Sequence, residues 1–269
     1  MTAIPDVKPA AGEVVIPTSA EEAVEAFGDG SGVTLVGGGT IVLADMNYGR
    51  IAPSRVVLLG RAGLAGIARD RSQVTIGAGT SVQDLIGLAA PLGPCAANVA
   101  DIEIRLQGTV GGNLCAGAGG EVPRGDLQGA FLALGATARS AGDDGIGTEP
   151  LEEFLTRRDE RLLLDVSFEE PAAGAFASLS RPHTHDYTAL AVSGVRTPGG
   201  ELRLAATGVG SWGQRLPSAE AAAADPEQAG RAALGDVDLR DDALASAWYR
   251  EHTLPILVQR VLVRLEEAT

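Results

Sequence analysis

The sequence has little cysteine and almost no lysine, and both shortages exclude kinds of chemistry. Two cysteines, Cys95 and Cys115, occur among 269 residues. An iron–sulfur cluster needs about four thiolate ligands, so this chain cannot hold one by itself. Lys8 is the only lysine among 21 lysines and arginines, which excludes Schiff-base chemistry at every other position. If electrons pass through this chain, an organic cofactor must carry them.

Long apolar runs and a positive net charge are also missing. No run approaches the roughly 18–20 apolar residues that span a bilayer. The first residues lack the basic and apolar blocks of a signal peptide. The formal net charge of −14 repels phosphate backbones. We therefore expect a cytoplasmic globular protein that neither inserts into a membrane nor binds nucleic acid.

The first part of the chain reads as alternating helices and strands interrupted by glycine-rich loops. A buried strand is predicted at 33–36, and it runs directly into Gly37-Gly38-Gly39-Thr40. A helix is predicted at 82–90, after the capping residues Thr80-Ser81. The stretch 93–125 is rich in glycine and shows little periodicity, so we expect a long loop there. Structured loops of that length are usually functional.

The second part begins after a junction near residue 170. Two neighbouring strands are predicted at 187–196 and 201–210, joined by the turn Thr197-Pro198-Gly199-Gly200. The last segment, 241–267, has a helical pattern, and Pro255 predicts a break within it. The sequence thus predicts an α+β protein in two parts.

Two glycine-rich segments, LVGGGT (35–40) and GTVGGN (108–113), are the candidates for ligand binding. Glycine lets a backbone approach a phosphate closely and turn its N–H groups toward it. A single glycine run after a strand is more often only a tight turn. A Rossmann fingerprint would need a third glycine where Val42 stands, and the lysine of a P-loop is absent.

The context of both segments resembles a known family. Residues 101–136, DIEIRLQGTVGGNLCAGAGGEVPRGDLQGAFLALGA, resemble the FAD-binding region of molybdenum hydroxylase flavoprotein subunits of the carbon monoxide/xanthine dehydrogenase type. In that family a segment like IRNxGTIGGNLA…D(L/Y)PxALLALDA follows a first loop like AGGTDLL. VTIGAGTSVQDL (74–85) and SAWYREHTLPILVQRVL (246–262) are also similar to family segments, in the same order. The interval from Thr109 to Asp126 is a few residues longer than is usual.

The resemblance implies a particular fold and a particular division of the chain. The fold is a vanillyl-alcohol-oxidase/PCMH-like FAD-binding domain of two α+β subdomains, followed by a small C-terminal α+β domain. The FAD-binding domain would cover residues 1–170, with subdomains at about 10–55 and 56–170. The C-terminal flavoprotein domain would cover residues 171–269.

The resemblance also implies which residues bind FAD non-covalently. Backbone N–H groups of 36–41 and 109–113 would face the diphosphate, and Thr40 and Thr109 could add hydroxyl groups. Asp126 would accept a hydrogen bond from the polar chain of the flavin and would cap the following helix. The implied cofactor contacts are Val36, Gly37, Gly38, Gly39, Thr40, Ile41, Thr109, Gly111, Gly112, Asn113, Asp126 and Arg181.

The remaining reactive side chains have less specific interpretations. His183 and His185 could share one face of a strand, but a solvated loop is the favoured interpretation over a metal site. Cys115 could approach the flavin or could be a packed thiol, and Cys95 is expected in the core. No catalytic side chain and no metal site is expected, because a bound flavin carries the redox chemistry itself.

Three functions remain open. The first is an FAD-dependent oxidoreductase subunit that relays electrons to an external acceptor. It would receive them from a small subunit with two iron–sulfur clusters, beside a large subunit with the molybdenum cofactor. The second is a stand-alone FAD oxidase or dehydrogenase for a small organic substrate. The third is a non-catalytic binding or assembly protein, and the intact GTVGGN segment disfavours it.

Overall fold

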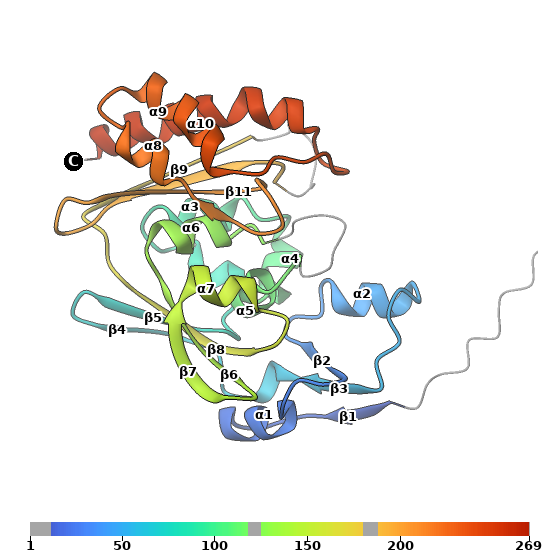
Figure 1. The fold of residues 1–269 in the computed structure, drawn as a ribbon. Helices are drawn as coiled ribbons and strands as arrows, with labels where there is room; N and C mark the ends of the chain where they lie inside the picture. The colour runs from blue at the N-terminus through green and yellow to red at the C-terminus, as the bar shows by residue number, and fades with distance from the viewer. Residues whose placement is uncertain (1–11, 118–124, 180–187, 269) are drawn as a thin grey trace, which may run out of the picture.

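The computed structural model describes residues 12–117, 125–179 and 188–268, which form three sheets from three successive stretches of the chain (Figure 1). We name these stretches the N-terminal lobe (13–58), the middle lobe (67–169) and the C-terminal lobe (173–268). The lobes agree with the α+β prediction, whereas the exact domain boundaries stay a prediction. Within the described ranges, no helix is long and apolar enough to cross a membrane.

The N-terminal lobe is a three-stranded parallel sheet with the strand order β1-β3-β2. The first helix, α1, begins at Ala20, because the Ser19 side chain accepts a hydrogen bond from the Glu22 amide. Phe27 at its end packs against Leu162 and Leu164 of the middle lobe, which joins the two lobes. The elements are β1 (Glu13–Val15), α1 (Ala20–Phe27), β2 (Val33–Val36), α2 (Val42–Asn47) and β3 (Arg55–Leu58).

The middle lobe is an antiparallel sheet of order β4-β5-β8-β6-β7, with short helices inserted between β5 and β6. A 3-10 helix, η1 (Leu59–Arg61), leads into it. Its strands are β4 (Ile67–Asp70), β5 (Gln73–Gly77), β6 (Thr137–Gly142), β7 (Gly145–Pro150) and β8 (Leu162–Glu169). Its helices are η2 (Val82–Leu85), α3 (Leu92–Ala97), α4 (Ile102–Gln107), α5 (Val110–Leu114), α6 (Gln128–Ala133) and α7 (Leu151–Thr156).

Two predictions for this lobe are wrong. The helix expected at 82–90 is a 3-10 turn that ends at Leu85. The described part of the long loop expected at 93–125 contains the three short helices α3, α4 and α5. Glycine disfavours isolated helices, and helices this short are stable only through tertiary packing. In α5 that packing comes from Val110 and Leu114, which are fully buried.

The C-terminal lobe is an antiparallel sheet of order β12-β11-β10-β9 between two helices. α10 lies along one face, and α6 of the middle lobe packs against β10 and β11 on the other (Figure 1). The predicted hairpin is confirmed as β10 and β11. The elements are β9 (Ala173–Ser178), β10 (Ala191–Arg196), β11 (Leu202–Thr207), β12 (Gln214–Arg215), α8 (Pro217–Ala221), α9 (Pro226–Ala232), η3 (Ala233–Asp236) and α10 (Ala247–Glu267).

The helix break expected at Pro255 is also wrong, because α10 continues through this residue. A proline inside a helix costs about 3 kcal/mol. The helix offsets that cost by burying an apolar face, which includes Leu254, Leu257 and Val258. Gly230 of α9 lies so close that a Cβ built on it would be 2.6 Å from the Pro255 carbonyl oxygen.

We predict that Arg250→Met unfolds the C-terminal lobe more easily. Arg250 is 1% exposed; its Nη2 donates to Asp242 at 2.6 Å and its Nε to the Ala189 carbonyl at 3.1 Å. Removing one partner of a buried ion pair costs about 3–5 kcal/mol. Urea unfolding should show that loss, whereas Arg260→Ala on the exposed face of α10 should stay within about 0.5 kcal/mol of the wild type. Equal stabilities for both variants would contradict this account.

Candidate functional site

The two glycine-rich segments meet in space although about seventy positions separate them in the sequence. A Cβ atom built on Gly38 would lie 1.8 Å from the carbonyl oxygen of Gln107. One built on Gly37 would lie 2.6 Å from the Thr109 hydroxyl oxygen. Real Cβ atoms do not approach neighbours that closely, so only glycine permits this contact between the N-terminal and middle lobes.

A groove runs along this contact as two adjoining cavities, one of about 630 Å³ and one of about 210 Å³. Gly37, Ile41, Thr109 and Gly112 line both cavities. The two loops therefore lie where the cavities adjoin, and the other lining residues of the two cavities largely differ. An extended ligand with a phosphate centre and a bulky group at each end matches this shape.

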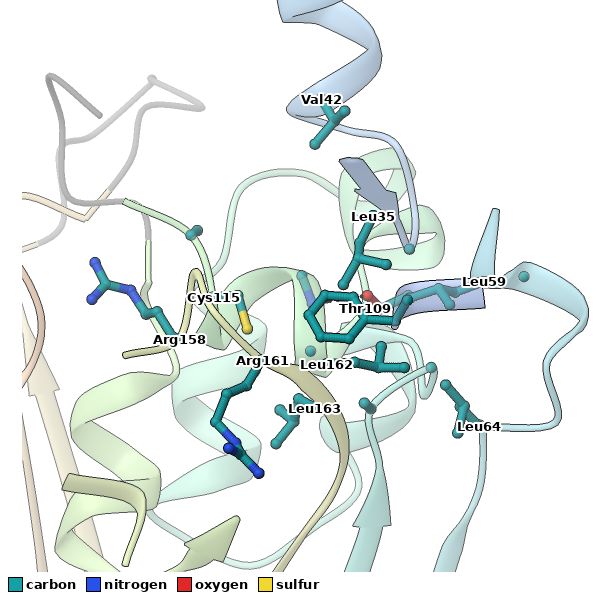
Figure 2. A pocket seen from close by; sticks show the side chains of 18 of the residues that line it. Leu35, Val42, Leu59, Leu64, Thr109, Cys115, Arg158, Arg161, Leu162 and Leu163 are labelled. Atoms are coloured by element: carbon teal, nitrogen blue, oxygen red, sulfur yellow. Dashed lines mark hydrogen bonds between the residues drawn. The ribbon is translucent and has the colours of Figure 1, made fainter. Parts of the chain in front are cut away.

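The larger cavity has an apolar side and a polar end (Figure 2). Leu35, Leu59, Leu64 and Leu162 surround the region next to Thr109. Such walls favour a flat ring system, because burying apolar area is stabilising and excludes water. The polar end is lined by Cys115, Arg158, Asp159 and Arg161.

Cys115 follows α5 on the wall of the larger cavity. Burial raises the pKa of its thiol to about 12, so the sulfur stays protonated near neutral pH. A neutral thiol is a poor nucleophile. Cys115 therefore contributes packing surface here. Cys95 is buried in the core, as expected.

The first loop has backbone N–H groups to offer a ligand. Within the described part of the chain, the amides of residues 37–41 donate to no protein acceptor. Gly37 to Ile41 line the smaller cavity, where such amides can bind an anion. Val36 differs, because it is a buried residue of β2 that lines neither cavity.

The second loop uses most of its amides inside the protein. The Gly111 amide donates to the Ala78 carbonyl at 2.8 Å, and the Asn113 amide to the Thr109 carbonyl at 2.9 Å. The Gly112 amide donates to the Thr109 hydroxyl at 3.1 Å. Gly111 and Asn113 therefore have no free amide for a ligand, contrary to the expectation from sequence. What this loop presents is bare backbone, the Thr109 hydroxyl and the Asn113 side chain.

Asn113 and Asp126 lie together on the wall of the smaller cavity. The Asn113 Oδ1 accepts a hydrogen bond from the Leu127 amide at 2.9 Å, which fixes the position of Asp126 next to it. Asp126 is 7% exposed. Burial raises the pKa of its carboxyl to about 6, and hydrogen bonds from Thr188 and Asn113 oppose that rise.

The expected capping role of Asp126 is wrong. α6 begins at Gln128, and Leu127 occupies the cap position without a side-chain bond. The Asp126 backbone carbonyl instead accepts hydrogen bonds from the Cys95 thiol at 3.3 Å and the Thr207 hydroxyl at 3.3 Å. The Asp126 carboxyl lies on the wall of the smaller cavity and accepts hydrogen bonds from Thr188 and Asn113. Arg181, His183 and His185 lie outside the described residues.

Sequence reasoning missed the apolar walls of the groove. They come from α1, β2, β8 and the segment after β3, and examples are Phe27, Leu35, Leu59 and Leu163. In the sequence each is an ordinary apolar residue of a buried element. Only the packing of the lobes brings them to one cavity, so no local pattern could have identified them.

The fold and the groove define a protein built to bind an extended nucleotide cofactor between two lobes. Residues 9–168 match the family described as FAD binding domain in molybdopterin dehydrogenase, which is more than half of the chain. The chain belongs to this family, and FAD is its cofactor. It is an FAD-binding subunit of the molybdenum hydroxylase type.

Solved structures agree with the family over nearly the full length. A carbon monoxide dehydrogenase chain from Hydrogenophaga pseudoflava is 26% identical with a TM-score of 0.86, covering 97% of this chain and 99% of that one. One from Oligotropha carboxidovorans is 23% identical with a TM-score of 0.85, covering 98% and 100%. One of quinoline 2-oxidoreductase from Pseudomonas putida 86 is 21% identical with a TM-score of 0.81, covering 97% and 99%. No curated protein matches the sequence.

We predict that Gly38→Ala destabilises the flavin-free protein, because the added methyl group must push the two loops apart. Overpacking of this kind typically costs about 1–3 kcal/mol. Gly87→Ala is the matched control, since no atom lies within 4 Å of a Cβ built there. Thermal unfolding should show a lower midpoint for Gly38→Ala alone. An unchanged midpoint would mean that the loops do not touch as described.

The raised pKa of Asp126 predicts how stability depends on pH. The folded state keeps the Asp126 proton up to a pKa of about 6, whereas the unfolded chain releases it near the ordinary 3.8. Protonation of Asp126 therefore stabilises the folded state fully below pH 3.8, and this contribution is lost as the pH rises through 6. Raising the pH from 4 to 7 should lower wild-type stability relative to Asp126→Asn by about 2 kcal/mol in urea unfolding without flavin. A pH-independent difference would contradict the assignment.

Proposed function

We propose that the groove binds FAD in an extended form, with the diphosphate at the contact between the two glycine loops. The chain would receive electrons from the iron–sulfur clusters of a small partner subunit and pass them through FAD to an external acceptor. A large partner subunit would hold the molybdenum cofactor. One observation carries this proposal: two cavities lead away from a single glycine-lined contact in a chain of this family.

The residues at the contact fit a dinucleotide diphosphate. The free amides of residues 37–41 supply donors for its oxygens, and the Thr109 hydroxyl adds another. Larger side chains at 37 or 38 would close the contact on which the groove is built. In the larger cavity the formal charges of Arg61 and Arg158 balance those of Asp45 and Asp159, and Arg161 is paired with Asp144, so the amides of the first loop are the main anion donors.

The protein's part in the chemistry is binding, orientation and exclusion of water. Bound FAD supplies the redox chemistry. The leucines of the larger cavity keep water from a ring placed among them, and Asn113 and Asp126 fix the polar chain in the smaller cavity. Among the described residues, only Cys95 and Cys115 offer thiol ligands, so in this proposal the iron–sulfur clusters that pass electrons to FAD belong to another subunit.

Exposed apolar side chains beside the smaller cavity support docking of a partner. Leu43 on α2 is 46% exposed, and Ile102 and Leu106 on α4 are 49% and 58% exposed. The same two helices contribute Val42 and Ile104 to the cavity wall. A partner bound there would sit next to the cofactor groove, which suits electron transfer between subunits.

The test is titration of the full chain with FAD at several pH values. Bound FAD should give the visible flavin absorption band after desalting. A ligand hydroxyl that donates to Asp126 favours the ionised carboxyl, so affinity should rise about tenfold between pH 5 and 7, one pKa unit of linkage. Asp126→Asn should remove that rise, whereas Asp70→Asn on the exposed surface should keep it.

Two outcomes would count against the proposal. Absence of any flavin band after incubation with FAD would overturn the flavin assignment itself. Bleaching of bound flavin by a small organic substrate, without partner subunits, would instead favour a stand-alone oxidase or dehydrogenase. Co-purification of an iron–sulfur and a molybdenum subunit would support the relay.

A further inference from the structure

Gln128 is a buried side chain that hydrogen bonds in two directions at once. It is 2% exposed and stands at the start of α6. Its Nε2 donates to the carbonyl of Leu114, the last residue of α5, at 2.8 Å. Its Oε1 accepts from the Gly213 amide at 2.7 Å, in the segment between β11 and β12 of the C-terminal lobe.

The surroundings leave Gln128 no other position. A Cβ built on Gly125 would lie 2.3 Å from the Gln128 amide group, and one built on Gly213 would lie 2.9 Å from its Cβ. Both neighbouring backbones therefore pack directly against this side chain. A buried amide whose nitrogen and oxygen are both hydrogen bonded fixes geometry strongly, because leaving either atom unpaired costs free energy.

The bond to α5 reaches the cofactor groove. Thr109 caps the start of α5, which contains Gly112 and Asn113, and these three residues line the smaller cavity. Gln128 satisfies a carbonyl at the far end of this short helix, where a helix has no internal donor. The Leu127 amide also donates to the Asn113 side chain. Two consecutive residues, which directly follow Asp126, therefore hold α5.

The bond to Gly213 connects this assembly to the C-terminal lobe. Gly213 follows Trp212, which packs against the core of the middle lobe and lies 5.4 Å from the Arg158 guanidinium. Figure 1 shows α6 between α5 and the C-terminal sheet.

We propose that Gln128 is a positioning residue that sets α5, and with it Thr109 and Asn113, in register with the C-terminal lobe for cofactor binding. The inference rests on the proposed function for its effect on FAD. Its structural part, the attachment of α5, can be measured without FAD. A positioning role differs from general stabilisation because it acts on one short helix.

Three variants separate the possibilities. Gln128→Met keeps the size and removes both hydrogen bonds. Gln128→Glu keeps the acceptor for Gly213, but its carboxyl can donate to the Leu114 carbonyl only when protonated. Ser178→Ala is the matched control, because the Ser178 hydroxyl joins the same two lobes through Asn98 at 3.0 Å, after α3, without reaching α5.

The expected result is about tenfold weaker FAD binding for Gln128→Met, equivalent to about 1.4 kcal/mol, and wild-type affinity for Ser178→Ala. Gln128→Glu should bind FAD weakly at high pH. As the pH is lowered and the new carboxyl is protonated, its affinity should approach that of the wild type measured at the same pH. In the flavin-free chain, Cys115 should react severalfold faster with a thiol reagent in Gln128→Met, because the end of α5 is released.

Each other outcome overturns a defined statement. Unchanged FAD affinity and unchanged Cys115 reactivity in Gln128→Met would overturn the positioning role. Equal losses of FAD affinity in Gln128→Met and Ser178→Ala would mean that Gln128 only stabilises the fold in general. The same conclusion would follow if the FAD affinity of Gln128→Glu did not rise as the pH is lowered. If the wild type binds no FAD while Cys115 reactivity still rises in Gln128→Met, the proposed function fails and the attachment of α5 stands.

Discussion

The structure depends on one close approach, the backbone of Gly38 against the carbonyl of Gln107. Two lobes of different topology meet there, one parallel and one antiparallel. Because no side chain separates them, the main chain of both lobes lines a narrow passage with a cavity on each side. A phosphate group needs main-chain donors at short range, and this arrangement brings them to the middle of the groove.

The two loops contribute differently to that passage. The second loop is the rigid side, since its amides bond to Ala78, to Thr80 and within α5. Asn113 and Gln128 attach it further to α6 and the C-terminal lobe. The first loop keeps its amides free. The preformed second loop therefore supplies shape, and the first loop supplies donors for a charged ligand.

The sequence predicted the parts of this protein that depend on local pattern. The strand before Gly37 and the hairpin of β10 and β11 follow from short-range signals, whereas the two glycine segments were singled out through their resemblance to a family. The helices α3 and α5 did not follow, since the glycine and proline in their sequences favour turns and packing stabilises them. α4 was missed although Asp101 caps its start. The helix break predicted at Pro255 was wrong because packing decides here too: the buried apolar face of α10 outweighs one missing hydrogen bond. The apolar walls and the role of Gln128 depend on contacts between lobes, which no local signal records.

Hydrogen–deuterium exchange of the full chain with and without FAD tests the central claim most directly. The account predicts that FAD slows exchange in the segment 37–41, whose amides have no protein acceptor, and changes little at Gly111 and Asn113, which are already bonded. Binding of FAD with no protection at 37–41, and protection confined to another part of the chain, would contradict it.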